Sequence, residues 1–324
     1  MAMTTYLEAI RQGIWEEMER DDSVFVLGED VGVYGGAFKV TAGFLDHFGP
    51  KRVIDTPISE SAIVGASIGA AYMGMRPVAE MQFIDFISCA FDQITNFAAK
   101  SRYRWGAGVP IVVRGPSGGN THGGPFHSQN VESFFLNTPG LKIVQPSTAY
   151  DAKGLIKAAI RDEDPVLYFE HKFLYRRIKE DLPAEDFIVP IGKAALRRAG
   201  SDLSIITYGA MVYNALEAAE ALAKDGVQTD VLDLRSLAPL DEEAILETAS
   251  KTGKVIVLHE ACLTGGAGGE IAARIAEKAF EFLDAPIMRV AAKDTPVPYS
   301  PPLEQFFLPQ TEGVLETARR LLAY

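Results

Sequence analysis

Apolar and polar residues alternate along this chain in two different periods, and together they predict an α/β protein. Thr5 and Glu8 have the capping-box spacing that begins a helix. The apolar stripe that follows at helical spacing comprises Tyr6, Ile10, Ile14 and Met18. A short apolar run at 23–28 then has the length and residue types of a strand.

The same alternation of strand and helix continues through the first half of the chain. The further expected strands are 52–55, 77–81, 110–113, 142–144 and 166–169, and the helices between them lie near 60–74, 86–104 and 148–160. Short connections between such elements are typical of a parallel sheet covered by helices on both faces.

A charged stretch with a proline, 179–186, interrupts this pattern and predicts a domain boundary. The pattern then restarts. The expected strands are 203–208, 229–233, 254–259 and 287–290. The expected helices are one that ends at residue 224, one over 241–251, one that begins after residue 268 and one near 312–322. Asp241 and the acids after it suit a helix start. We therefore expect two doubly wound α/β domains, 1–185 and 186–324.

Composition and charge narrow the function classes. The net charge of −12 argues against a nucleic-acid partner, because phosphate binding needs clustered basic residues. Cys89 and Cys262 are far apart, outside any metal or disulfide pattern, which fits a reducing compartment. The longest apolar uncharged run, Ser61–Met75, is short for a membrane span, and the N-terminus lacks the features of a targeting peptide. We expect a soluble, cytoplasmic protein without a membrane partner.

The segment from Asp55 to Ala71 is the first candidate for chemistry. A strand ends there and a helix of small residues begins, with Glu60 in its first turn. Glu60 could simply complement the helix dipole. Alternatively, its apolar neighbours would desolvate the carboxyl group, which is a useful condition for proton handling.

Two further segments are candidates. Phe83, Phe86 and Phe91 follow an expected strand and could be core residues or could wall an aromatic slot at its carboxyl end. A glycine-rich loop, 114–129, carries His122 and His127 but lacks the Gly-Lys-Ser/Thr of a phosphate-binding P-loop. Two histidines are too few for a metal site, so His127 is a candidate base on a flexible arm.

Several ordered stretches together resemble the beta subunits of thiamine-diphosphate-dependent 2-oxo acid dehydrogenases. The stretches that carry the resemblance are Leu27–Val31, Asp55–Glu60, Arg76–Glu80, His127–Gln129, Pro139–Ile143, Asp151–Ile156 and Ala159–Asp162. The resemblance spans essentially the whole chain. It implies a thiamine-pyrimidine-binding domain followed by a transketolase C-terminal-like domain.

The resemblance also implies roles for individual residues. Glu60 matches the glutamate that hydrogen-bonds the aminopyrimidine ring of the cofactor and activates it, and Phe86 matches the aromatic residue packed on that ring. Phe83 lies toward the substrate, and His127 matches a loop histidine that helps acyl transfer to a lipoyl arm. The other expected cofactor-binding residues are Glu29, Ile58, Ser59 and Gln82.

Metal ions and partner chains follow from the same resemblance. A structural K⁺ site of mainly backbone carbonyls would fall at Ile111, Ala159, Ile160, Asp162 and Asp164. No Gly-Asp dipeptide occurs, so the Gly-Asp-Gly segment that holds Mg²⁺ and the diphosphate would come from an alpha subunit. The resemblance implies an α2β2 heterotetramer. The C-terminal domain of this chain, near Asp294 and Tyr324, would then contact a lipoyl acyltransferase core.

The substrate and two rival functions stay open at this point. Segments near His259 and His127 look more like branched-chain members, whereas 191–194 and 208–212 also occur in pyruvate enzymes, and acetoin-cleaving relatives share the scaffold. A nicotinamide dehydrogenase is a rival, because 203–233 reads strand–helix–strand, but its turn lacks G-x-G-x-x-G. A non-catalytic assembly subunit is a third possibility.

Overall fold

The computed structural model describes residues 3–324, which form two compact units. Unit 1 takes the described residues up to Ser117 together with Phe134–Ile191, and unit 2 takes Gly118–Ser133 and Gly192–Tyr324. The units therefore divide after Ile191, beyond the predicted boundary at residue 185. The segment 118–133 also belongs to unit 2, although it is inserted in the sequence of unit 1. A boundary drawn at one point of the sequence cannot represent this segment, because its assignment to unit 2 depends on contacts with residues far away in the chain.

The strands of unit 1 run in the order β6-β7-β5-β4-β2-β3, with every neighbouring pair parallel. Their bounds are β2 (Val24–Gly28), β3 (Val53–Asp55), β4 (Arg76–Glu80), β5 (Val112–Ser117), β6 (Lys142–Val144) and β7 (Val166–His171). A separate antiparallel pair joins β1 (Thr4–Thr5) to β8 (Lys179–Glu180). β2, β5 and β7 are buried along their whole length, as expected for central strands covered on both faces.

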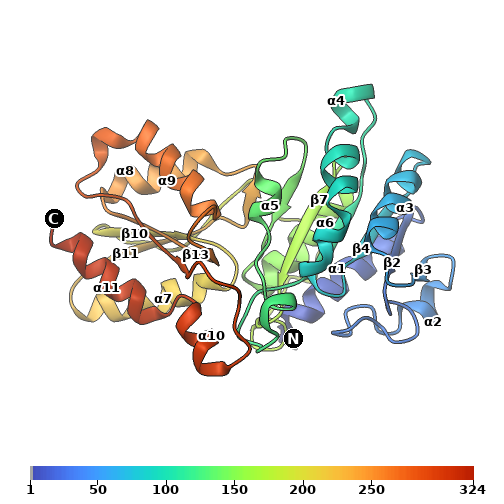
Figure 1. Cartoon of the computed structure of the whole chain (residues 1–324), viewed down its shortest axis with the longest axis horizontal. Helices are drawn as coiled ribbons and strands as arrows, with labels where there is room; N and C mark the ends of the chain where they lie inside the picture. The colour runs from blue at the N-terminus through green and yellow to red at the C-terminus, as the bar shows by residue number, and fades with distance from the viewer. Residues whose placement is uncertain (1–2) are drawn as a thin grey trace. The chain divides into compact units, whose positions relative to one another are not determined.

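Helices connect these strands (Figure 1). They are α1 (Tyr6–Arg20), α2 (Phe44–Phe48), α3 (Glu60–Tyr72), α4 (Ser101–Trp105), α5 (Ser133–Leu136) and α6 (Ala149–Arg161). The predicted capping box at the start of α1 is confirmed, since Thr5 Oγ1 accepts from the Glu8 N–H while the Glu8 carboxylate accepts from the Thr5 N–H. α1 packs against α6, and α3 packs on β4.

The single helix predicted over 86–104 is wrong. The chain forms a 3₁₀ segment η1 (Ile84–Ala90), a π-helical segment η2 (Gln93–Ala98) and the short α4. The Ser88 and Thr95 hydroxyls donate back to the carbonyls of Asp85 and Phe91, at 3.0 and 2.8 Å. Such bonds bend helices, and the apolar periodicity of this segment does not reveal them.

Unit 2 is a second doubly wound sheet, with strand order β14-β13-β10-β11-β9. The strands of this sheet are β9 (Ala195–Arg198), β10 (Leu203–Thr207), β11 (Thr229–Asp233), β13 (Val255–Cys262) and β14 (Met288–Ala292). The short strand β12 (Ser236–Ala238) also lies in unit 2 but is not part of this sheet. Its helices are α7 (Met211–Lys224), α8 (Glu242–Thr252), α9 (Ala267–Lys278), α10 (Pro301–Phe307) and α11 (Thr311–Leu322), with 3₁₀ turns η3 (Gly124–Phe126) and η4 (Phe280–Phe282).

The helices of unit 2 cover both faces of its sheet. α7 packs against α11 on one side, and α8 packs against α9 on the other (Figure 1). Asp241 caps α8 as the sequence predicted, accepting from the Ala244 N–H. The predicted α/β class with two doubly wound domains is confirmed. No helix among residues 3–324 is long and apolar enough to span a membrane, and the cytoplasmic location stays a prediction.

A buried ion network joins three strands of unit 1 near their carboxyl ends. Arg114 of β5 pairs with Glu80 of β4 and, through two nitrogens, with Glu170 of β7, to which Nη2 donates at 2.7 Å. The Tyr175 hydroxyl also donates to Glu170, at 2.5 Å. All four side chains are almost fully buried. Burial raises the pKa of Glu80, Arg114 opposes the shift, and the Glu170 carboxylate adds to it.

Replacing Arg114 by methionine should therefore destabilise the fold strongly. The side-chain volume is similar, but two buried carboxylates lose their cation, which costs about 3–5 kcal/mol of unfolding free energy. Urea unfolding of the two proteins measures this loss. Arg102→Met is the matched control, because the Arg102–Asp164 pair is half exposed and should be worth less than about 1 kcal/mol. Equal destabilisation by both substitutions would show that the network has no special role.

Candidate active site

The strand order of unit 1 brings three predicted site segments to one place. The chain passes from β2 to β3 on one side, then through α3 to β4 on the other side of β2. Gly28 at the end of β2 is therefore in register with both Asp55 of β3 and Glu80 of β4. Ligands of open α/β sheets bind at the carboxyl ends of strands where the strand order reverses in this way. Glu29, Glu60 and Gln82 follow those three strand ends.

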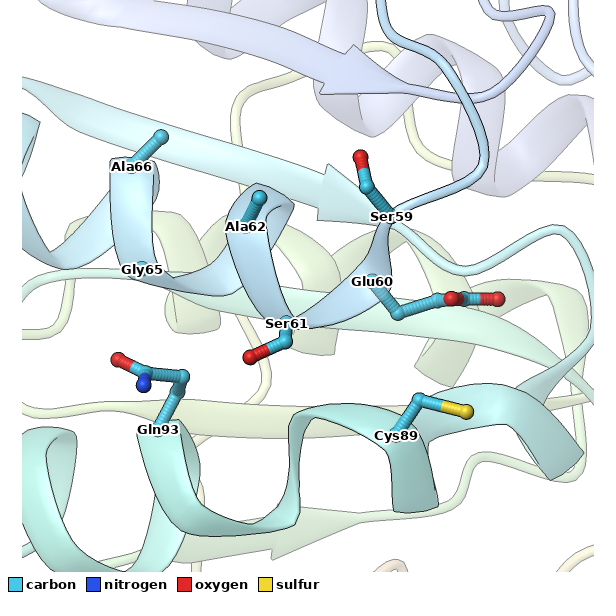
Figure 2. A pocket seen from close by; sticks show the side chains of 8 residues that line it. All are labelled: Ser59, Glu60, Ser61, Ala62, Gly65, Ala66, Cys89 and Gln93. Carbon is cyan, nitrogen blue, oxygen red and sulfur yellow. The ribbon is translucent and has the colours of Figure 1, made fainter.

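Glu60 begins α3 and lines an open pocket of about 580 Å³. Figure 2 shows its side chain extending from the first turn of the helix, with Cys89 and Gln93 contributed by the neighbouring η1 and η2 segments. The remaining lining residues are Ser59, Ser61, Ala62, Gly65 and Ala66. The small residues of α3 leave the space that forms the pocket, while only 9% of Glu60 is exposed.

Glu29 lies beside Glu60 and is itself buried. Burial raises the pKa of Glu29, and the Glu60 carboxylate raises it further, whereas a hydrogen bond from the backbone of Ser59 opposes the shift. One carboxylate oxygen, Oε1, is buried without a hydrogen-bond partner in the described structure. Because a buried polar atom without a partner is costly, this oxygen is suited to accept a hydrogen bond from a ligand.

The loop after Glu29 is held by groups that the sequence did not single out. Asp55 accepts from the N–H groups of Gly32 and Val33 at 2.6 and 3.3 Å, and so ties this loop to the end of β3. Gln82 donates to Asp30 at 2.9 Å. The predicted residue Gln82 therefore contacts this loop through Asp30, while Asp55 binds the backbone of the same loop.

The predicted aromatic residues occupy different environments. Phe83 packs edge-to-face on Phe38, with ring centroids 5.5 Å apart, and Phe38 contacts Tyr175 in turn. Phe86 is half-buried on η1 and does not line the pocket of Glu60. Ile58 is 82% exposed, so in this structure it is a surface residue beside the pocket rather than a wall of it.

His127 belongs to unit 2, on the loop 118–133. It is half-buried, and its N–H donates to the Gly124 carbonyl at 3.3 Å. The other loop histidine, His122, is half exposed and pairs with the buried carboxylate of Glu304 at 2.7 Å. The two histidines therefore differ in exposure, and His122 is held by its ion pair with Glu304 of α10.

A buried polar cluster in unit 2 lies at the point where its strand order reverses, between β10 and β13. The Tyr208 hydroxyl donates to Glu132 at 2.8 Å, and the His259 ring stacks on Tyr208. Burial raises the pKa of Glu132 to about 7, opposed by that hydrogen bond and assisted by Glu260. Burial also lowers the pKa of His259 to about 4, so that its ring is neutral at pH 7.

Two family models together cover most of the chain. The transketolase pyrimidine-binding domain matches residues 2–177, and the transketolase C-terminal domain matches residues 192–314. The 2-oxoisovalerate dehydrogenase subunit beta of Bacillus subtilis (strain 168) is 56% identical over 328 residues, covering 100% of this chain and 99% of that protein. The chain belongs to the family of 2-oxo acid dehydrogenase beta subunits. The resemblance inferred from the sequence is thereby confirmed.

Other relatives of this 2-oxo acid dehydrogenase beta subunit have a different named activity. The pyruvate dehydrogenase E1 component subunit beta of Bacillus subtilis is 44% identical, and that of Staphylococcus aureus (strain COL) is also 44% identical, each over the full length of both chains. Thiamine diphosphate is the cofactor of the family. The segment 203–233, weighed above as a nicotinamide-binding unit, lies inside the transketolase C-terminal match.

Solved structures agree on the fold. A chain described as a split gene transketolase, inactive beta4 tetramer, superposes with a TM-score of 0.81 at 22% identity and 99% coverage of both chains. Transketolase from Leishmania mexicana gives a TM-score of 0.74 at 16% identity, with 100% of this chain covering 46% of that one. At these identities the likeness supports the architecture of the beta subunit alone.

The carbonyls expected to bind K⁺ in this beta subunit already accept hydrogen bonds. Arg76 Nη1 donates to the carbonyl oxygens of Ile160 and Asp162, at 3.1 and 2.9 Å. The Ile111 carbonyl accepts from the Val166 N–H at 3.0 Å. A carbonyl oxygen has a second lone pair, but the guanidinium would repel a cation beside it. The K⁺ site stays a prediction that the position of Arg76 does not favour.

Among residues 3–324, no group of three or more His, Cys, Asp or Glu side chains could hold a metal ion. The expected carboxylates of the K⁺ set are occupied by cationic partners. Lys142 pairs with Asp162 at 2.6 Å, and Arg102 pairs with Asp164 at 2.5 Å.

The sequence reasoning missed several residues that the structure places at the two switch points. Cys89 and Gln93 line the pocket of Glu60. Their spacing of four residues would have placed them on one face of a helix, and this was the only hint in the sequence. Glu132, Tyr208 and Glu260 carried no such signal, because they come from three segments far apart in the chain.

Glu132 predicts a pH dependence of stability. Between pH about 4.5 and about 7 the folded chain retains a proton on Glu132 that the unfolded chain has lost. Raising the pH through this window therefore lowers the stability, by about 3 kcal/mol if the whole shift is expressed. Glu132→Gln keeps an acceptor for Tyr208 and removes this dependence.

Urea unfolding of the full chain at pH 5 and pH 8 checks this expectation. The variant should gain stability relative to wild type as the pH rises, whereas Glu277→Gln, at an exposed position, should behave like wild type at both pH values. A wild-type minus variant difference that does not change with pH would contradict the protonated state assigned to Glu132.

Proposed function

We propose that this beta subunit activates thiamine diphosphate through Glu60, in an enzyme that is complete only with an alpha subunit. The observation that carries the proposal is the position of Glu60. It is a buried carboxyl group at the start of α3, at the wall of an open pocket and at the switch point of the sheet. A glutamate that served only the helix dipole would not need to be buried.

The residues present fit the aminopyrimidine half of the cofactor. Glu60 and the partnerless Oε1 of Glu29 supply polar groups, and the small side chains of α3 leave room for a flat ring. Glu60 would hold the ring by a hydrogen bond and control a proton there. Glu29 would place a second carboxyl group next to Glu60. Ser59 orients Glu29 through its backbone N–H. Bound thiamine diphosphate supplies the carbanion chemistry of decarboxylation.

The remaining predicted contacts follow from the same arrangement. Gln82 and Asp30 hold the loop after Glu29, and Phe83 with Phe38 forms an aromatic wall that suits the substrate side. Phe86 and Ile58 would reach the ring only after the pocket is completed. His127 would help to transfer the acyl group to a lipoyl arm by holding or moving a proton.

An alpha subunit is needed because this chain lacks the diphosphate half of the site. The sequence has no Gly-Asp dipeptide that could begin a Mg²⁺-diphosphate motif. An α2β2 heterotetramer would supply it, with Mg²⁺ held by the alpha chain. The acidic surface of the C-terminal domain, together with the exposed Tyr324, would contact a basic segment of the lipoyl acyltransferase core.

A branched-chain 2-oxo acid is the proposed substrate. The relative named for 2-oxoisovalerate is 56% identical, whereas the relatives named for pyruvate are 43–44% identical over the same length. Each identity is taken over the full length of this chain, so the comparison measures overall kinship rather than one pocket residue. Pyruvate is the alternative substrate, and the experiment below separates the two.

Glu60→Gln should abolish turnover of the reconstituted enzyme, by about a hundredfold or more, because the amide cannot exchange the proton that the carboxyl group controls. Steady-state decarboxylation by the complex measures this. Glu312→Gln is the matched control, since it removes an exposed first-turn acid from α11 and so tests the helix-dipole explanation alone. Full activity of the Glu60→Gln complex would rule out the proposed role.

Activity should also require the alpha subunit and should favour the branched-chain substrate. Decarboxylation of 2-oxoisovalerate and of pyruvate is measured with thiamine diphosphate and Mg²⁺, for this chain alone and for the co-expressed pair. We expect turnover only in the mixed assembly, with a higher kcat/KM for 2-oxoisovalerate. Turnover by this chain alone would refute the shared site, and a preference for pyruvate would reassign the substrate without affecting the role of Glu60.

A further inference from the structure

The loop 118–133 is inserted in the sequence of unit 1 but is bound into unit 2, and its two ends meet in a narrow neck. The Gly118 N–H donates to the Gln129 carbonyl at 3.0 Å. A single carboxylate oxygen, Glu260 Oε1, accepts from the Gly119 N–H at 2.6 Å and from Asn130 Nδ2 at 2.9 Å. Glu260 therefore ties the first and the last part of the loop together, and His127 lies in the lobe between them.

The backbone of β13 turns Glu260 toward this neck. In the parallel pair of β13 and β14, Leu258 is opposite Val290 and Cys262 is opposite Ala292, so extra residues are inserted on β13 between them. Such bulges re-aim side chains and occur next to active sites. The inserted segment holds His259 and Glu260, and both are almost fully buried.

The bulge needs close approach by the next helix. A Cβ added at Gly266 or Gly268 would lie within 2.6 Å of the His259 ring. His259 in turn stacks on Tyr208, whose hydroxyl donates to Glu132 at the end of the loop. The loop thus has a second anchor beside Glu260, and the crevice where an open α/β sheet usually binds a ligand holds a segment of the chain itself.

The lobe of the loop is held as well, but at the surface of unit 2. Gly124 has a φ of +70°, and a Cβ there would lie within 2.4 Å of the Tyr299 ring. His122 pairs with Glu304 of α10. These contacts restrict the lobe, whereas Glu260 sets the path by which the chain enters and leaves it.

We propose that Glu260 is a positioning residue for the 2-oxo acid dehydrogenase reaction. From the bulge of β13 it fixes the neck of the loop 118–133 and so sets the orientation of His127. The inference rests on the proposed function in assigning acyl transfer to His127. Without Glu260 the two donors of the neck lose their shared acceptor, and the lobe can shift within the limits of its other contacts while the sheet stays intact.

The test combines hydrogen exchange with kinetics of the complex assembled with its alpha subunit. In Glu260→Ala, the amides of 120–128 should exchange at least about tenfold faster, with the strands of unit 2 unchanged. The kcat for reductive acylation of a lipoyl domain should fall about 10- to 100-fold, because small displacements of a catalytic group have large effects. The KM for the 2-oxo acid should stay within about twofold.

Conservative variants separate positioning from stability. Glu260→Gln keeps the acceptor oxygen and should restore both the slow exchange and most of the kcat. Asn130→Ala removes one donor of the neck and should give an intermediate effect. In a His127→Ala background, Glu260→Ala should cause no further fall in kcat, because both changes remove the same contribution.

The outcomes distinguish this inference from the proposed function. Unchanged exchange of the loop in Glu260→Ala, or faster exchange without a fall in kcat, would overturn the positioning role, as would an equal further fall in the His127→Ala background. A fully active His127→Ala complex would reject the role assigned to His127 and, with it, the kinetic effect expected of Glu260, while the exchange of amides 120–128 in Glu260→Ala would still report whether Glu260 fixes the neck.

Discussion

Parallel strands can be joined only by crossovers, and this constraint places the two main polar sites of the chain, around Glu60 and around Glu132. A crossover returns the chain to the same end of the sheet, so the carboxyl ends of all the strands lie along one edge. Where the strand order reverses, the two crossovers run over opposite faces of the sheet, and a crevice forms between them. In unit 1 this happens beside β2, and in unit 2 beside β10. Both crevices are lined by buried carboxyl groups.

The two crevices use their carboxyl groups differently. In unit 1, Glu60 raises the pKa of the neighbouring Glu29, and an oxygen of Glu29 has no hydrogen-bond partner in the described structure. Their mutual repulsion and desolvation are costs that a ligand with hydrogen-bond donors would relieve. In the same sheet Glu80 and Glu170 share one cationic partner, Arg114. The contrast separates carboxyl groups that hold the fold from those available for chemistry.

The crevice of unit 2 is filled by its own loop rather than left open. Glu260 supplies an acceptor for the two ends of that loop, and Glu132, near its end, enters the crevice to meet Tyr208. A glycine-rich segment such as 118–124 has much conformational freedom to lose, so it needs several anchors to present one histidine in one orientation. The anchors are Glu260 of β13, Glu304 of α10 and Tyr208, the residue that follows β10.

The sequence by itself determined the α/β class, most strand and helix positions, the family, and Glu60 as the leading candidate. These are local properties, because the periodicity of a strand or helix and the residues after a strand end are read within a short window. Only the tertiary structure decided that the loop 118–133 belongs to unit 2, that 84–105 is a broken helix, and that Arg76 occupies the carbonyls of Ile160 and Asp162. It also decided that Glu260 binds both ends of this loop and that Glu132 of the loop meets Tyr208. Those facts depend on contacts between residues far apart in the chain, and no periodicity records which distant groups a fold brings together.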